Sequence, residues 1–160
     1  MSWLSGKAII ARKGVAVLVT SLFPHHQWHI WRFERVPANW WASPENRMEY
    51  LQWLAAKLNY TKLEDWYQVT TLTIRKNYGT GLLDIYDNSV IEMLRANFPE
   101  HDWKPWKFLR VGGTWWNKME NQVAYCTWVM EQIGLSNMED WYHVTVQQVI
   151  NLHGTLIVEI

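Results

Sequence analysis

Apolar residues recur at helical spacing in the middle of each half of the chain. In the first half, the segment after Ser43 has apolar side chains every three or four positions, at Met48, Leu51, Leu54, Ala55 and Leu58. This spacing predicts an amphipathic helix. Ser43 suits its N-cap, and Pro44 suits its first turn. In the second half, Asn117 and Glu120 stand three apart, which predicts Asn117 as the N-cap of an equivalent helix.

A shorter helix is predicted before each of these. In the second half, Asn88-Ser89 offers an N-cap to an apolar run that Pro99 ends. The corresponding segment of the first half, residues 14–22, is rich in valine. Valine favours strands as well as buried helices, so both structures stay open there.

A third helix is predicted to begin at Thr70 in the first half and at Thr145 in the second. The segment after Thr145 fits a capping box, with a glutamine three residues on. Gly79 and Gly154 follow at the place of a left-handed C-cap. The β-branched tail over residues 155–160 is either a short strand or a frayed end.

The tryptophans divide the chain into two copies of one unit. Of the 13 tryptophans, twelve form six pairs that are 75 residues apart: Trp28/Trp103, Trp31/Trp106, Trp40/Trp115, Trp41/Trp116, Trp53/Trp128 and Trp66/Trp141. Such self-similarity indicates a tandem repeat. We therefore divide the chain into an N-terminal extension over residues 1–10, a first unit over 11–85 and a second unit over 86–160.

Composition limits what these units can form. The 160 residues are 49% hydrophobic and contain no long apolar run of the kind that crosses a membrane. Because a unit of this size is marginal alone, we expect the copies to share an interface. The predicted fold is mostly α, with two tandem three-helix units packed together and the termini as the place for any short strands. The single cysteine, Cys126, corresponds to Leu51 and is expected to be a buried thiol.

The charges balance overall but not along the chain. Fifteen basic and fifteen acidic residues give a formal net charge of zero, which disfavours an extensive phosphate-backbone binder. No acidic residue precedes Glu34, whereas Lys7, Arg12 and Lys13 do. A basic, acid-free N-terminus resembles an organelle-targeting segment. We expect an intracellular protein of the nucleus or cytoplasm, with an organelle as the alternative.

Two groups of residues invite a chemical role. His25, His26 and His29 have a spacing that metal ligands use on a helix, but Pro24 disfavours a helix there, and only His101 remains in the second copy. We expect His26 and His101 to bond backbone carbonyls beside neighbouring tryptophans.

The adjacent acids Glu64-Asp65 and Glu139-Asp140 invite acid–base catalysis. Both copies carry them, as they would carry a structural device. We expect Asp65 and Asp140 to accept backbone N–H groups in a turn, or to pair with Arg35 and Arg110. Nucleotide-loop, zinc-protease and serine-hydrolase motifs are missing from the sequence. It therefore predicts a non-enzymatic protein without catalytic residues, metal site or cofactor.

The tryptophans are too many for a core of this size. Adjacent Trp40-Trp41 and Trp115-Trp116 cannot both face inward, so one of each pair is expected to be partly exposed. Aromatic side chains beside cations can stack bases or hold a peptide. The predicted ligand-binding residues are Arg32, Arg35, Trp40, Trp41, Lys107, Arg110, Trp115 and Trp116. The alternative is that these tryptophans seal an interface between the copies.

Three phrases carry a resemblance: FPEHDWKPWKF (98–108), WNKMENQ (116–122) and MEDWYHVT (138–145). They resemble the tandem repeats of a family of uncharacterised eukaryotic proteins with FPEHxWxxWKF and EDWYxVT motifs. The first copy departs from that pattern at His25, at Ile30 and before Phe23. The resemblance implies the repeat and no established activity.

From the residues themselves we expect a binding module. The leading ligand is DNA or RNA, because basic–aromatic clusters recur in both copies. The alternative is a protein–protein interaction or assembly module, with a protein partner or a homo-oligomer, which the zero net charge favours. No membrane partner is expected.

Overall fold

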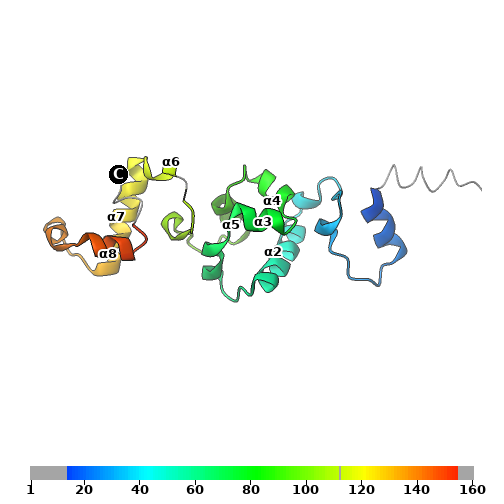
Figure 1. The fold of residues 1–160 in the computed structure, drawn as a ribbon, viewed down its shortest axis with the longest axis horizontal. Coiled ribbons are helices and arrows are strands. Elements are labelled where there is room, and N and C mark those ends of the chain that lie inside the picture. The colour runs from blue at the N-terminus through cyan, green and yellow to red at the C-terminus, as the bar shows by residue number, and fades with distance from the viewer. Residues whose placement is uncertain (1–13, 112, 155–160) are drawn as a thin grey trace, which may run out of the picture. The chain divides into compact units, whose positions relative to one another are not determined.

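The chain is mostly helical, as predicted. The computed structural model describes residues 14–111 and 113–154, and within these ranges every regular element is an α-helix or a 3-10 helix (Figure 1). The predicted extension over residues 1–10 and the tail over 155–160 lie outside the described residues. None of the described helices is both long and apolar enough to cross a membrane.

The molecule consists of two compact units, Met1–Asp102 and Trp103–Ile160. The boundary between the two units follows Asp102 and lies 17 residues after the boundary between the two sequence copies, which follows Ile85. The boundaries of the sequence copies and of the compact units therefore do not coincide. The second copy contributes its first helix to the first unit.

Unit 1 contains a helical segment over residues 14–22 and seven named elements. The valine-rich segment over 14–22 is thus a helix and not a strand. In chain order the named elements are η1 (Ile30–Arg32), η2 (Trp40–Ala42), α2 (Pro44–Leu58), η3 (Leu63–Gln68), α3 (Thr71–Lys76), α4 (Thr80–Ile85) and α5 (Val90–Asn97).

Unit 2 contains η4 (Pro105–Lys107), α6 (Gly113–Trp116), α7 (Met119–Ile133), η5 (Met138–His143) and α8 (Val146–Asn151). The bounds of η4, α7, η5 and α8 each equal those of η1, α2, η3 and α3 plus 75. The same local sequence therefore gives the same local structure twice.

The long helices α2 and α7 begin and end differently. The Ser43 hydroxyl caps α2 by accepting the Asn46 N–H at 3.3 Å, as predicted. Helix α7 has Lys118 at its N-cap with no side-chain cap, so the prediction of Asn117 was wrong. Left-handed residues end both helices, Asn59 with φ 57° and Gly134 with φ 72°. Asparagine and glycine are the residues that adopt this conformation most readily.

The third helix is shorter than the sequence suggested. Thr70 and Thr145 cap α3 and α8 as predicted, but α3 ends before Gly79 and α4 follows as a separate helix. The left-handed residues after α3 and α8 are Tyr78 and His153, each with φ 66°. Gly79 and Gly154 are therefore not left-handed C-caps, and their reason for being glycine lies elsewhere.

Close packing explains these glycines. A Cβ on Gly79 would collide with the hydroxyl of Tyr50, and a Cβ on Gly154 would collide with the hydroxyl of Tyr125. Both hydroxyls donate to carbonyls at the end of the third helix: Tyr50 to Asn77 at 3.0 Å, and Tyr125 to Leu152 at 3.1 Å. Each tyrosine thus fastens the long helix to the third helix of its own copy.

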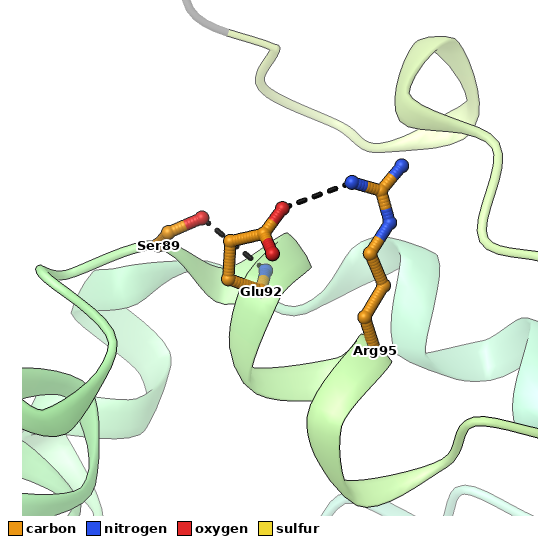
Figure 2. Close-up of polar contacts among 3 residues, drawn as sticks. All are labelled: Ser89, Glu92 and Arg95. Atoms are coloured by element: carbon orange, nitrogen blue, oxygen red, sulfur yellow. Dashed lines mark hydrogen bonds and ion pairs between the residues drawn. The ribbon is translucent and has the colours of Figure 1, made fainter.

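Helix α5 closes the core of unit 1. It packs on α2 and α4, and its Met93 and Leu94 are fully buried. The Ser89 hydroxyl caps it by accepting the Glu92 N–H at 3.3 Å, and Glu92 pairs with Arg95 at 2.9 Å (Figure 2). Since α5 belongs to the second sequence copy, it brings one helix of that copy into contact with α2 and α4 of the first.

The paired acids have a structural role. One carboxylate oxygen of Asp65 accepts the Thr61 and Lys62 N–H groups at 2.8 and 3.1 Å. Asp140 does the same with Ser136 and Asn137 at 2.7 and 3.1 Å. These bonds lie in the turn before η3 and before η5, and they lower the pKa of both carboxyl groups. The expectation that Asp65 and Asp140 accept hydrogen bonds from backbone N–H groups in a turn is confirmed.

Candidate functional site

An aromatic cluster fills each unit. In unit 1, buried Trp31 lies 5.7 Å from Trp40, 5.5 Å from Tyr50 and 5.4 Å from Trp53, between ring centroids. Edge-to-face and offset arrangements at such distances are the favoured geometries of aromatic pairs. Because α2 carries two of these rings and η1 and η2 carry the others, the cluster joins the long helix to the aromatic loop.

Unit 2 repeats the cluster with nearly the same distances. Trp106 lies 5.9 Å from Trp115, 5.6 Å from Tyr125 and 5.4 Å from Trp128. The indole N–H groups of Trp31 and Trp106 are buried without a hydrogen-bond partner. The repeated tryptophans therefore serve mainly as scaffold.

The adjacent tryptophans divide their roles in the same way in both units. Trp41 and Trp116 are buried, with 9% and 2% of their surface exposed. Trp40 and Trp115 are half-buried and pack edge-on against them, at 4.6 and 4.7 Å. Trp41 also fills the space beside Gly81, where a Cβ would meet its indole nitrogen at 2.5 Å. Of these four tryptophans, Trp40 and Trp115 are the two that expose part of a ring.

Among the described residues, cations lie over aromatic rings in both units. In unit 1, the guanidinium carbon of Arg32 is 6.0 Å from the Tyr78 ring centroid, and Lys57 Nζ is 5.1 Å from that of Trp53. Trp53 and Tyr78 are themselves 6.5 Å apart. This places two cations and two aromatic rings on one surface, which we call the unit 1 basic–aromatic surface.

Unit 2 has a related arrangement, which we call the unit 2 basic–aromatic surface, but its rings are buried, with 8% of Trp128 and 6% of Trp106 exposed. Lys107 Nζ lies 5.6 Å from the Trp128 ring, and Lys104 Nζ lies 5.8 Å from the Trp106 ring. His153 takes the place of Tyr78, and burial and then the charge of Lys107 lower the pKa of His153. The lowered pKa favours the uncharged form of this imidazole at neutral pH.

The other predicted cations lie apart from the rings. Arg35 and Arg110 are both exposed. Neither lies over a ring in the part of the chain that the structure describes. Of the four predicted cations, Arg32 and Lys107 thus belong to the basic–aromatic surfaces, and Arg35 and Arg110 are outside them.

A hollow opens beside the unit 1 surface. It has a volume of about 260 Å³, and its lining includes His26, Trp28, His29, Arg32 and Phe33. His26 packs edge-on against Trp28 at 4.4 Å. His29 stacks near Trp53 at 5.9 Å, and its Nδ1 is buried without a hydrogen-bond partner.

The histidines do not gather as metal ligands do. No group of three or more histidine, cysteine or acidic side chains in the described ranges could hold an ion. His101 Nε2 lies 3.3 Å from a side-chain group, the Tyr67 hydroxyl, whereas a backbone carbonyl was expected as its partner. Cys126 is half-buried and not fully buried as expected, and burial raises the pKa of its thiol.

Sequence reasoning missed Trp53, Lys57 and Tyr78. The first two stand four apart on α2, a spacing that brings side chains together on one helix face. That signal was available in the sequence. The sequence held no such signal for Tyr78. Its ring lies under Arg32, which is distant in the chain, and its backbone has a left-handed φ of 66°.

Comparison of the chain with protein-family models, with curated proteins and with solved structures gives no match. The family resemblance of the sequence motifs therefore stays a prediction, and the site must be interpreted from its own geometry.

Proposed function

We propose that the chain is a non-enzymatic module that binds single-stranded nucleic acid, DNA or RNA, through its two basic–aromatic surfaces. The observation that carries this proposal is the recurrence of cations over aromatic rings in both units, at 6.0 Å for Arg32 and 5.6 Å for Lys107. Single-strand binders combine these two elements, with rings that stack bases and cations that follow the phosphates.

The backbone at the surface supports a binding role. Tyr78 and His153 both have positive φ, which is uncommon for residues other than glycine, asparagine and aspartate. Strained residues that persist often lie at functional sites. Tyr78 keeps 47% of its surface exposed, so its ring is open to a base.

The hollow fits a small planar group. At about 260 Å³ it is slightly smaller than the roughly 300–1,000 Å³ found for ligand pockets. Trp28, Phe33 and two histidines supply flat walls, and Arg32 supplies a positive charge. A base with its phosphate nearby matches that lining.

The arrangement gives no support to catalysis. Two carboxyl groups with a lowered pKa, Asp65 and Asp140, accept hydrogen bonds from backbone N–H groups in turns. Two tyrosines with a raised pKa, Tyr50 and Tyr125, fasten helices together. Perturbed groups at a catalytic site would instead meet in a cleft.

We further propose that the two 75-residue copies act as tandem three-helix units packed together, each presenting one such surface. Two linked weak sites bind a long strand more tightly than either alone, because the second contact forms within one complex. This arrangement offsets the zero net charge, since each site needs few phosphate contacts.

The deciding experiment compares two double variants that remove equal charge. Fluorescence anisotropy of a labelled oligothymidylate measures affinity across a range of salt concentration. We expect Arg32→Gln with Lys107→Gln to weaken binding and to reduce the slope of log K against log salt by about 1.4, at about 0.7 per lost phosphate contact. Arg35→Gln with Arg110→Gln should change the affinity less.

Three results would contradict the proposal. One is no binding at low salt. Another is binding without salt dependence, and the third is an equal loss in the two double variants. A duplex probe of the same length separates single-strand stacking from general attraction to phosphate, since paired bases cannot stack on the exposed rings.

An assembly module is the second candidate. Unit 2 exposes several large apolar side chains, among them Met138, Tyr142 and Val146. These residues lie away from the basic–aromatic surface in sequence and suit a protein partner.

A further inference from the structure

Unit 1 shows how a helix from the following sequence copy docks. After α5, Phe98 lies 5.8 Å from Trp66 between ring centroids. Phe98 also lines a hollow of about 230 Å³ with Leu51 and Trp66. Met93 and Leu94 of α5 are fully buried. The apolar side of the docking segment, residues 89–101, is therefore covered by α2, α4 and η3.

Polar contacts fix the position of that segment. Arg47 Nε donates to Asn97 Oδ1 at 3.0 Å. The Tyr67 hydroxyl lies 3.3 Å from His101 Nε2, and it donates to the Asp102 carbonyl at 3.5 Å. We call Leu51, Trp66 and Tyr67 the docking site.

The equivalent site in unit 2 is folded but open. Its residues are Cys126, Trp141 and Tyr142, each 75 positions after its counterpart, and η5 has the same length as η3. Tyr67 has 8% of its surface exposed, whereas Tyr142 has 83%. Trp141 and Cys126 are half-buried, whereas both of their counterparts are buried.

A matching docking segment exists in the first copy. Residues 14–26 correspond to 89–101, with Phe23-Pro24 at Phe98-Pro99 and His26 at His101. Residues 14–22 are helical, as α5 is. Leu22 and Phe23 have 61% and 59% of their surface exposed, so the apolar face of this segment is also open.

We propose that the protein assembles head to tail, with residues 14–26 of one copy docked on Cys126, Trp141 and Tyr142 of a second copy. The contact continues the interface that α5 makes in unit 1. In that interface the docking site precedes the docking segment along the chain. Residues 14–26 precede the unit 2 site of their own molecule, so a second copy restores the order and extends the array by the same step.

The two surfaces in this contact differ, so it is heterologous. Such contacts produce open chains of molecules, or rings where the rotation closes. In the assembly, Tyr142 meets His26 as Tyr67 meets His101, and Phe23 enters the hollow beside Trp141. This interface shares only His26 with the hollow beside the unit 1 basic–aromatic surface. It does not depend on whether nucleic acid binds.

Complementation between two variants tests the proposal in the full chain. Phe23→Asp removes the docking segment, and Tyr142→Asp removes the docking site. We expect wild-type protein to form concentration-dependent oligomers by light scattering, and each variant to be a monomer. Because each variant keeps the surface that the other lacks, an equal mixture should form a dimer and nothing larger.

A matched control uses Leu109→Asp, which changes an apolar side chain that is 69% exposed and lies outside both surfaces. It should assemble as the wild type does, and far-UV circular dichroism should show equal helix content in every variant. A wild-type protein that is monomeric at all concentrations overturns the proposal. So does a mixture that stays monomeric.

Disulfide trapping distinguishes docking between two molecules from docking within one molecule. In Phe23→Cys, the new thiol should lie beside Cys126 of the next copy, as Phe98 lies in one hollow with Leu51. Mild oxidation should give a ladder of oligomers on a non-reducing gel. Adding Cys126→Ser should reduce the ladder to a dimer at most. A shifted monomer band would show docking within one molecule and would overturn head-to-tail assembly.

Discussion

The hydroxyl of Tyr50 occupies the space where a side chain on Gly79 would begin, and Tyr125 and Gly154 repeat this relationship 75 residues later. Each hydroxyl donates to carbonyls at the end of the third helix. Neither glycine has a positive φ. The close contact with the tyrosine hydroxyl explains why both positions require glycine. It also ties each long helix to a helix that lies about 25 residues away in sequence, at |i−j| of 24 and 27.

Gly79→Ala should destabilise unit 1 by about 1–3 kcal/mol, the cost typical of overpacking. The new Cβ would press on the Tyr50 hydroxyl and on the Ile74 side chain. Urea denaturation of the full chain measures the change in free energy of unfolding. In a Tyr50→Phe background the same substitution should cost less, because the colliding hydroxyl is gone. Equal cost in both backgrounds would contradict the contact.

Trp41→Ala should cost more stability than Trp40→Ala. Trp41 is buried, so its removal leaves a cavity and should cost about 3–5 kcal/mol. Trp40 is half-buried, and its loss removes less packing. Chemical denaturation compares the two variants, and the pair Trp116→Ala and Trp115→Ala provides an independent repeat in unit 2. The reverse order would show that the outer tryptophan carries the packing.

Acid should remove the stability that Asp65 and Asp140 contribute. Hydrogen bonds from the Thr61 and Lys62 N–H groups lower the pKa of Asp65 in the folded state. The unfolded chain therefore takes up protons first, so this stability is present above the unfolded pKa of about 3.9 and disappears as pH falls through the folded value. Asp65→Asn with Asp140→Asn should be less stable than wild type at pH 7.

The difference in stability between wild type and the Asp65→Asn, Asp140→Asn variant should shrink as the pH falls toward 3. Thermal denaturation at a series of pH values measures it. Glu64→Gln with Glu139→Gln serves as the control, since it removes the same charges at adjacent positions. A difference that stays constant down to the acid limit would mean that the carboxylate charge has no part in the turn.

Lys107→Gln should raise the pKa of His153. Burial is the larger cause of its lowered pKa and the charge of Lys107 is the smaller, so the value should rise but stay below that of an exposed histidine. Titration of the imidazole resonances by NMR measures this shift. Lys104→Gln is the control and should leave His153 unchanged. No shift in Lys107→Gln would separate Lys107 from His153.

Unit 2 should also lose stability in mild acid through the same histidine. A folded-state pKa below the unfolded value means that the unfolded chain binds more protons in between. The stability is present above the unfolded pKa of about 6.5 and falls as the pH drops below it. In wild type this loss should begin near that pH in urea denaturation, whereas in Lys107→Gln it should be smaller.

Much of the local structure follows from the sequence because its causes are local. The caps at Ser43, Thr70, Ser89 and Thr145 act within three residues. Ser43 was predicted as a cap, Thr70 and Thr145 as the starts of helices, and Ser89 as one of two neighbouring candidates. The 75-residue spacing of the tryptophans also predicts that elements recur at the same interval, and four pairs of elements do. The basic–aromatic surface was predicted only in part, through Arg32 and Lys107.

The tertiary structure decided whatever depends on residues distant in the chain. Sequence alone did not show that the Tyr50 hydroxyl leaves no room for a side chain at Gly79, or that Arg32 lies over the Tyr78 ring. It also did not show that α5 leaves its own copy to close the core of unit 1. The periodic pattern fixes which face of a helix is apolar, but not which surface covers it. Burial depends on the position of every neighbour, so Tyr67 and Tyr142, in matching sequence, are buried in one unit and exposed in the other.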